Sequence, residues 1–139
     1  MNIVFLDIDG VLNNFMTTEK SQMGFTGIDS DKVSILSKVV KGLNAVIVLT
    51  TDWKLDWAFD KAKCTKDGLY MENKLKEFGL NIYGKTYEEK QQDRCKGIME
   101  WINNQKEKID KFIILDDNEF DIKPSEEVLF CLDIIENSV

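Results

Sequence analysis

The sequence predicts an α/β domain of three layers, in which helices cover both faces of a mostly parallel sheet of about five strands. Five short apolar runs alternate along the chain with longer amphipathic stretches, and this alternation is typical of parallel sheets. The runs are continuously apolar and rich in Val and Ile, as strands buried on both faces are. The length of 139 residues predicts one domain, over residues 1–139.

The apolar runs are the expected strands, and charged or polar residues flank them. Four of the runs are clear, and the third along the chain is weaker. In chain order they are residues 3–6 (IVFL), 45–49 (AVIVL), 80–83 (LNIY), 112–115 (FIIL) and 128–132 (VLFCL).

The stretches between the runs carry helical patterns. Asp29 precedes apolar residues at helical spacing and Gly42 follows them, so we expect a helix that is capped at its start and stopped by glycine. Before the fourth run, Ile98, Trp101 and Ile102 form one apolar stripe. The expected helices cover residues 30–42, 53–63, 69–78 and 93–108.

The composition excludes several kinds of catalytic and metal site. The chain has 25 acidic residues, a formal net charge of −7 and no histidine, so histidine-based nucleophile schemes and metal sites are excluded. The negative charge argues against bulk binding to nucleic acid. Three widely spaced cysteines suggest reduced thiols. With no apolar run near the ~20 residues of a membrane span and no signal-peptide pattern, we expect a cytoplasmic protein without membrane partners.

Polar residues follow three of the runs at the same topological position. In a parallel sheet the carboxyl ends of the strands meet at one edge, where the ligands of open α/β domains bind. Residues from separate runs are therefore expected to converge there. Asp7 and Asp9 follow the first run, Thr50, Thr51 and Asp52 follow the second, and Asp116 and Asp117 follow the fourth.

Converging carboxylates repel one another, and each raises the pKa of its neighbours unless a cation lies between them. Oxygen ligands without His or Cys favour Mg²⁺ over zinc or copper. Mg²⁺ in proteins usually takes one or two carboxylates together with a substrate phosphate. The sequence therefore predicts Mg²⁺ as the cofactor and a phosphorylated substrate.

The spacing of Asp7 and Asp9 suits phosphoryl transfer, because residues i and i+2 of an extended chain point to the same side. One carboxylate can attack phosphorus and form an aspartyl-phosphate. The other can give a proton to the leaving oxygen and later take one from water. Gly10 permits the sharp turn that must follow the strand.

A phosphoryl group in transfer also needs donors and positive charge around its oxygens. Thr50 offers a hydroxyl at the end of the second run. Arg94 is the only arginine of the chain, and its planar fork suits phosphate. The candidate cations are Lys54, Lys85, Lys90, Arg94 and Lys96.

The ordered set of motifs resembles the haloacid dehalogenase (HAD) superfamily of phosphohydrolases, which implies a Rossmann-like fold. The segments IVFLDIDGVLN, AVIVLTT and FIILDD are similar to its first, second and fourth motifs. Arg94 or Lys96 fits the third motif best. LTTDWK and RCKGIMEWI resemble a small capless branch related to polynucleotide-repair phosphatases, although position 54 is Lys where that branch tends to have Arg.

The resemblance implies a role for each matching residue. Asp7 would be the nucleophile and a metal ligand, and Asp9 the general acid–base, with its backbone carbonyl on the metal. Arg94 or Lys96 would offset charge. The remaining roles are Thr50 as the phosphoryl-holding catalytic residue, Gly10, Thr50, Thr51 and Lys54 as substrate-binding residues, and Asp116 and Asp117 as Mg²⁺ ligands, directly or through water.

No gap between the expected elements has room for a cap domain, so the site is expected to be open. Residues 11–28, which contain Gly24 and Gly27, are expected to form a flap. The expected function is Mg²⁺-dependent hydrolysis of a phosphomonoester, in a nucleotide, a polynucleotide end or a phosphoprotein. The sequence assigns no oligomeric state.

Alternative interpretations remain open. Each polar cluster taken alone also fits a solvated turn. A receiver-like phosphorylation switch uses similar residues, but its acceptor Asp lies on a middle strand, and residues 84–86 at the end of the third run contain no Asp. A catalytically silent HAD-like binding domain is a further alternative, although no motif residue is visibly missing.

Overall fold

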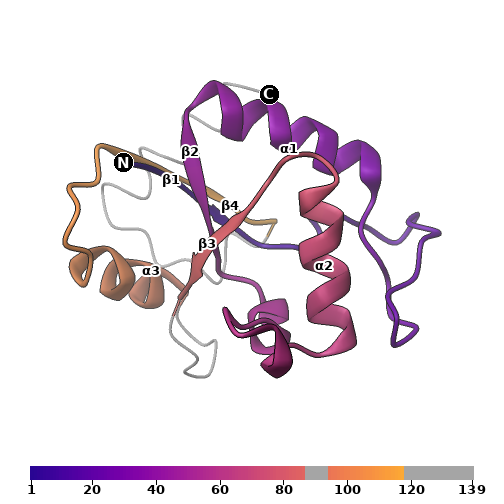
Figure 1. Ribbon diagram of the computed structural model, residues 1–139. Helices are drawn as coiled ribbons and strands as arrows, with labels where there is room; N and C mark the ends of the chain where they lie inside the picture. The colour runs from indigo at the N-terminus through magenta and orange to yellow at the C-terminus, as the bar shows by residue number, and fades with distance from the viewer. Residues whose placement is uncertain (87–93, 118–139) are drawn as a thin grey trace.

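The computed structural model describes residues 1–86 and 94–117, which form three layers around a parallel four-stranded sheet (Figure 1). The parallel α/β architecture predicted from the sequence is confirmed. The expected fifth strand, residues 128–132, lies outside the described residues. The strand order is β3-β2-β1-β4, with β1 at Asn2–Leu6, β2 at Ala45–Leu49, β3 at Ile82–Lys85 and β4 at Lys111–Leu115.

The central strand β1 pairs in register with a strand on each side. Leu6, its last residue, lies opposite Leu49 of β2 and Leu115 of β4. Three strands therefore end at the same level. The residues that follow them emerge side by side at one edge of the sheet, called the carboxyl edge below.

Alternate side chains of β1 enter two different cores. Val4 and Leu6 pack with residues of α1 (Ser30–Gly42) and α2 (Lys66–Lys76). Ile3 and Phe5 pack on the opposite face against α3 (Arg94–Asn103), and Figure 1 shows the helices on these two sides of the sheet. Burial of each large apolar side chain stabilises the fold by about 1.5–3 kcal/mol, which explains why continuous apolar runs form these strands.

The prediction of one helix over residues 53–63 is wrong. Two short 3₁₀ helices replace it, η1 at Asp52–Asp56 and η2 at Lys61–Lys63. Each has its own N-cap: the side chain of Thr51 accepts from Trp53 N, and that of Asp60 accepts from Ala62 N. Between them Trp57 is extended, with ψ at 142°, so the chain turns instead of continuing as one helix.

Other boundaries differ from the expected ones by a few residues. The helix α2 begins three residues early, because Thr65 caps it by accepting from Gly68 N at 3.2 Å. The strand β3 is displaced toward Lys85 from the expected run 80–83, and α3 ends at Asn103 instead of 108. Gly42 is the last helical residue of α1, and Asn44, with φ at +48°, makes the turn that follows.

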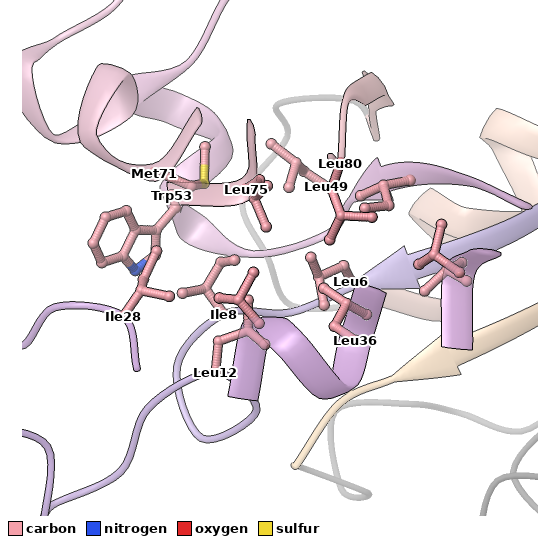
Figure 2. Packing of buried hydrophobic residues seen from close by; sticks show 14 of the residues in the cluster. Leu6, Ile8, Leu12, Ile28, Leu36, Leu49, Trp53, Met71, Leu75 and Leu80 are labelled. Carbon is pink, nitrogen blue, oxygen red and sulfur yellow. The ribbon is translucent and has the colours of Figure 1, made fainter. Parts of the chain in front are cut away.

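Residues 11–28 form a loop over one end of the core, called the 11–28 loop below. Leu12 and Ile28 are fully buried at its two ends, and Figure 2 shows Ile28 next to Trp53 and Leu12 next to Ile8. Further out, Ser21 Oγ and Met23 N donate to the carboxylate of Asp67 on α2 at 3.1 and 2.9 Å. The expected flap is therefore fastened to α2, and no cap domain interrupts the described residues.

None of the helices in residues 1–86 and 94–117 is long and apolar enough to cross a membrane.

Candidate active site

A cavity of about 350 Å³ opens at the carboxyl edge of the sheet and is called the edge cavity below. It collects residues from the ends of β1, β2 and β4 and from the start of α3. Residues that are far apart in the sequence thus share one space, as parallel strands with level ends require. Its described lining consists of Asp7, Asp9, Gly10, Thr51, Asp52, Arg94 and Asp117.

Asp7 lies at the inner end of the edge cavity and is 3% exposed. Its Oδ1 accepts from Ile8 N at 2.9 Å, and its Oδ2 lies 3.0 Å from Arg94 Nη1. Burial raises the pKa of Asp7 to about 6; Arg94 opposes this rise, and the charge of Asp116 adds to it. A cation beside this carboxylate would stabilise its charged form.

Asp116 and Asp117 bring two more carboxylates to Asp7. Oxygen atoms of the three residues all lie within 4.8 Å of one another. Arg94 Nη1 donates to Asp116 Oδ2 at 2.6 Å and bridges it to Asp7. One guanidinium offsets part of the charge of three carboxylates, and the oxygen-only donor set fits a hard cation such as Mg²⁺.

Asp9 is held from two sides at the mouth of the edge cavity. Asn13 Nδ2 and Trp53 Nε1 both donate to Asp9 Oδ1, at 2.9 and 3.2 Å. Asn13 Oδ1 in turn accepts from Gly10 N at 3.0 Å, which closes a small ring of hydrogen bonds. Both donors use the same oxygen of Asp9, so the carboxylate has a fixed orientation.

Gly10 occupies a position where a side chain would be strained and would displace Asp117. Its φ is +83°, in the left-handed region. A Cβ at this position would lie 1.9 Å from Asp117 Oδ2. The glycine therefore allows both the turn after β1 and the approach of Asp117 to Asp7.

The two threonines after β2 have different surroundings. Thr51 lines the edge cavity, and its hydroxyl accepts from Trp53 N at 3.3 Å. Thr50 is 2% exposed, and its hydroxyl has no hydrogen-bond partner among the described residues. Buried hydroxyls are almost always paired, so the Thr50 hydroxyl has a hydrogen bond still to make, but Thr50 is not among the described residues that line the edge cavity.

The family model for the HAD domain in Swiss Army Knife RNA repair proteins matches residues 3–132. The chain belongs to this family. The resemblance to the HAD superfamily and to nucleic-acid-repair members is thus confirmed, and the parallel sheet without a cap agrees with a small HAD fold. No curated protein and no solved structure matches the chain.

The HAD domain brings most of the predicted site residues to one place, but not all of them. Lys54 is 1% exposed and donates to Thr86 Oγ1 at 3.0 Å, and it does not line the edge cavity. Lys96 is exposed on α3 and also lies outside the lining. Lys85 donates to the carbonyl oxygens of Lys54 and Trp57. Within the described chain, Arg94 is the cation of the edge cavity; Lys90 lies outside the described residues.

Sequence reasoning missed the two residues that hold Asp9 in this HAD domain. Asn13 ends the quoted first motif, DGVLN, and its place four residues after Asp9 was a usable signal for a turn contact. Trp53 follows Thr51 by two residues, but its contact with Asp9 spans 44 positions. Nothing local in the sequence marks that contact.

Proposed function

We propose that this HAD domain is a Mg²⁺-dependent phosphomonoester hydrolase that removes phosphate from RNA ends through an aspartyl-phosphate on Asp7. One observation carries the proposal: three carboxylates from two strand ends lie within 4.8 Å, with Arg94 between them and a fixed Asp9 beside them. The family's description as RNA repair proteins favours an RNA end over the other substrates considered.

The proposed reaction has two steps. In the first, an Asp7 oxygen attacks phosphorus, the bond from phosphorus to the leaving oxygen breaks, and Asp9 gives that oxygen a proton. In the second, Asp9 takes a proton from water as the water oxygen attacks phosphorus, which releases phosphate and restores Asp7. Arg94 and the Thr50 hydroxyl would donate to the phosphoryl oxygens that carry the developing charge.

The proposed metal ligands are Asp7, Asp116 and Asp117, with the backbone carbonyl of Asp9. When bound there, Mg²⁺ would offset the repulsion between the carboxylates and an incoming phosphate. The overall charge of −7 opposes binding of a long polyanion, which favours a site that accepts only the phosphorylated end.

Phosphate release from RNA oligonucleotides with a 3′- or a 5′-phosphate tests the proposal, with Mg²⁺ and with a chelator. We expect release with Mg²⁺ only, and Asp7→Asn should lose nearly all turnover while its circular dichroism spectrum stays unchanged. Asp31→Asn is the matched control, because Asp31 is exposed on α1; it should keep full activity.

Two outcomes would contradict the proposal. A folded protein that releases no phosphate from any ester with Mg²⁺ is a silent binding domain. A long-lived acyl phosphate that forms once and does not turn over indicates a phosphorylation switch.

A further inference from the structure

A second and larger cavity, of about 730 Å³, lies beside the edge cavity and is called the aromatic cavity below. The two cavities share Asp9 and Asp52 in their linings, so a molecule with its phosphate in one can extend into the other. The volume lies within the roughly 300–1,000 Å³ of small-molecule sites. Besides the shared pair, its described lining is Asn13, Asn14, Phe15, Met23, Phe25, Thr26, Trp53, Asp56, Thr65 and Asp67.

The 11–28 loop presents large apolar side chains to this cavity and leaves them in water. Phe15 is 95% exposed, Phe25 68% and Met23 61%. Solvated apolar side chains gathered around one hollow mark a binding site. The indole of Trp53 also lines this cavity, and its Nε1 donates to Asp9 Oδ1.

The loop that carries these side chains is held in place. Asp67 fastens residues 21 and 23 to α2, and Lys74 on α2 pairs with Glu19 at 2.7 Å. Ile28 N donates to the Tyr70 hydroxyl at 3.0 Å. The cavity is therefore formed before any ligand arrives, which lowers the entropy that binding must overcome.

The charge of the aromatic cavity restricts its occupant. Four carboxylates line it, those of Asp9, Asp52, Asp56 and Asp67, and none of the described lining residues is Lys or Arg. A second phosphate would be repelled. A flat, uncharged group with N–H donors fits both the apolar walls and the carboxylate oxygens.

We infer that the aromatic cavity binds the base of the terminal nucleotide whose phosphate lies in the edge cavity. This inference rests on the proposed function and adds the group that is recognised. The next phosphate of the RNA would lie outside the aromatic cavity, away from its four carboxylates. The domain would thus prefer phosphate esters that carry a base over those that do not. It would not distinguish one base from another, because every base can stack.

The test compares two substrates that differ only in the base: the better of adenosine 3′- and 5′-monophosphate, and the matching ribose phosphate. Base stacking on aromatic side chains corresponds to roughly 5- to 150-fold in affinity, so kcat/KM should favour the adenosine compound by that factor. The double variant Phe15→Ala, Phe25→Ala should lose most of this ratio. Ile35→Ala, which removes a 63%-exposed side chain from α1, should keep it.

Binding to Asp7→Asn, measured by equilibrium dialysis of the same two compounds, separates this inference from the proposed function. If no ester is hydrolysed but the adenosine compound still binds more tightly, the function fails and the inference stands. Equal kcat/KM and equal binding for the two compounds would overturn the inference. It would also fall if the double variant weakened both compounds equally, or if a phosphotyrosine peptide were the better substrate.

Discussion

At the scale of single residues, the orientation of Asp9 matters most, because the proposed chemistry needs its proton at one place. Asn13 and Trp53 donate to the same oxygen. Trp53 is itself buried, 8% exposed, in the core that contains Ile28. The orientation of a mouth residue is therefore set by packing below it.

Replacing the indole N–H tests this positioning. Trp53→Phe keeps an aromatic ring and removes the hydrogen bond to Asp9. Such a bond to a charged group is worth about 1.5–3 kcal/mol, so kcat on an RNA end should fall about tenfold or more, with KM nearly unchanged. With p-nitrophenyl phosphate the first step, measured by the burst of p-nitrophenol, should lose much less, because its leaving group needs no proton. The second step, in which Asp9 takes a proton from water, should slow equally for both substrates. Equal losses in the first step would contradict a role for Trp53 in aligning Asp9.

Gly10 supports a second prediction at this scale. Gly10→Ala places a methyl group 1.9 Å from Asp117 Oδ2 at a φ of +83°, so Asp117 must move. Phosphatase activity should fall more than a hundredfold, while the free energy of unfolding drops by only about 1–3 kcal/mol. Gly42→Ala is the control, because nothing lies within 4 Å of its Cβ position. Near-normal activity of Gly10→Ala would show that the activity does not need Asp117 in its present position.

The single residues show why part of the site was predictable. Asp7, Asp9, Asp116 and Asp117 follow apolar runs directly, so strand pairing alone brings them together. Which threonine faces the edge cavity depends on how β2 ends. The partners of Asp9 depend on the path of the 11–28 loop, which no periodicity describes.

At the scale of elements, an ion pair joins the segment between β2 and α2 to α2 itself. Lys61 of η2 donates to Glu72 of α2, and Lys76 lies 3.8 Å from the same oxygen. Burial opposes ionisation of Glu72, but the hydrogen bond and charge of Lys61, with Trp57 and Lys76, lower its pKa below the usual value. Lys61 also lies over the Trp57 ring, 5.3 Å from its centroid.

This pair predicts a pH dependence of stability. A lowered pKa means that the ionised form of Glu72 stabilises the fold above about pH 4.3, and that this contribution is lost as pH falls through the folded-state pKa. Glu72→Gln should lower the free energy of unfolding by about 1 kcal/mol at pH 7 and by much less near pH 3. Urea unfolding at both pH values measures this. The exposed Glu107→Gln should have no effect at either pH, and a loss for Glu72→Gln that is the same at both would contradict the ion pair.

The elements themselves were predictable where apolar periodicity is strong. The strands β1, β2 and β4 and the helix α1 match the expected ranges within one residue. The structure of the segment after β2 was not predictable. Side-chain caps at Thr51 and Asp60 divide it into two short helices, whereas its composition predicts one.

At the scale of the whole molecule, the fold gathers negative charge at the carboxyl edge and leaves Arg94 as the cation in the described part of that site. A divalent ion that binds there should stabilise the folded state by mass action. At a concentration ten times its Kd the gain is about 1.4 kcal/mol, or roughly 2–8 °C in Tm.

Thermal unfolding with and without Mg²⁺ measures that gain. We expect Tm to rise with Mg²⁺ in the unaltered chain and to stay constant in Asp117→Asn, whatever the starting Tm of that variant. Asp31→Asn should respond like the unaltered chain. If Tm rose equally in Asp117→Asn, the ion would bind at another part of the molecule and not at the edge cavity.

The base of the 11–28 loop is closed by Asp29 N, which donates to Leu12 O at 2.9 Å. The two ends of the 11–28 loop thus meet at a fixed point. The position of β1 therefore does not depend on the number of residues in the loop. Lengthening such a closed loop costs little, about 0.6 kcal/mol for each doubling. A descendant of this domain can therefore acquire a longer loop here without moving the aspartates of the edge cavity.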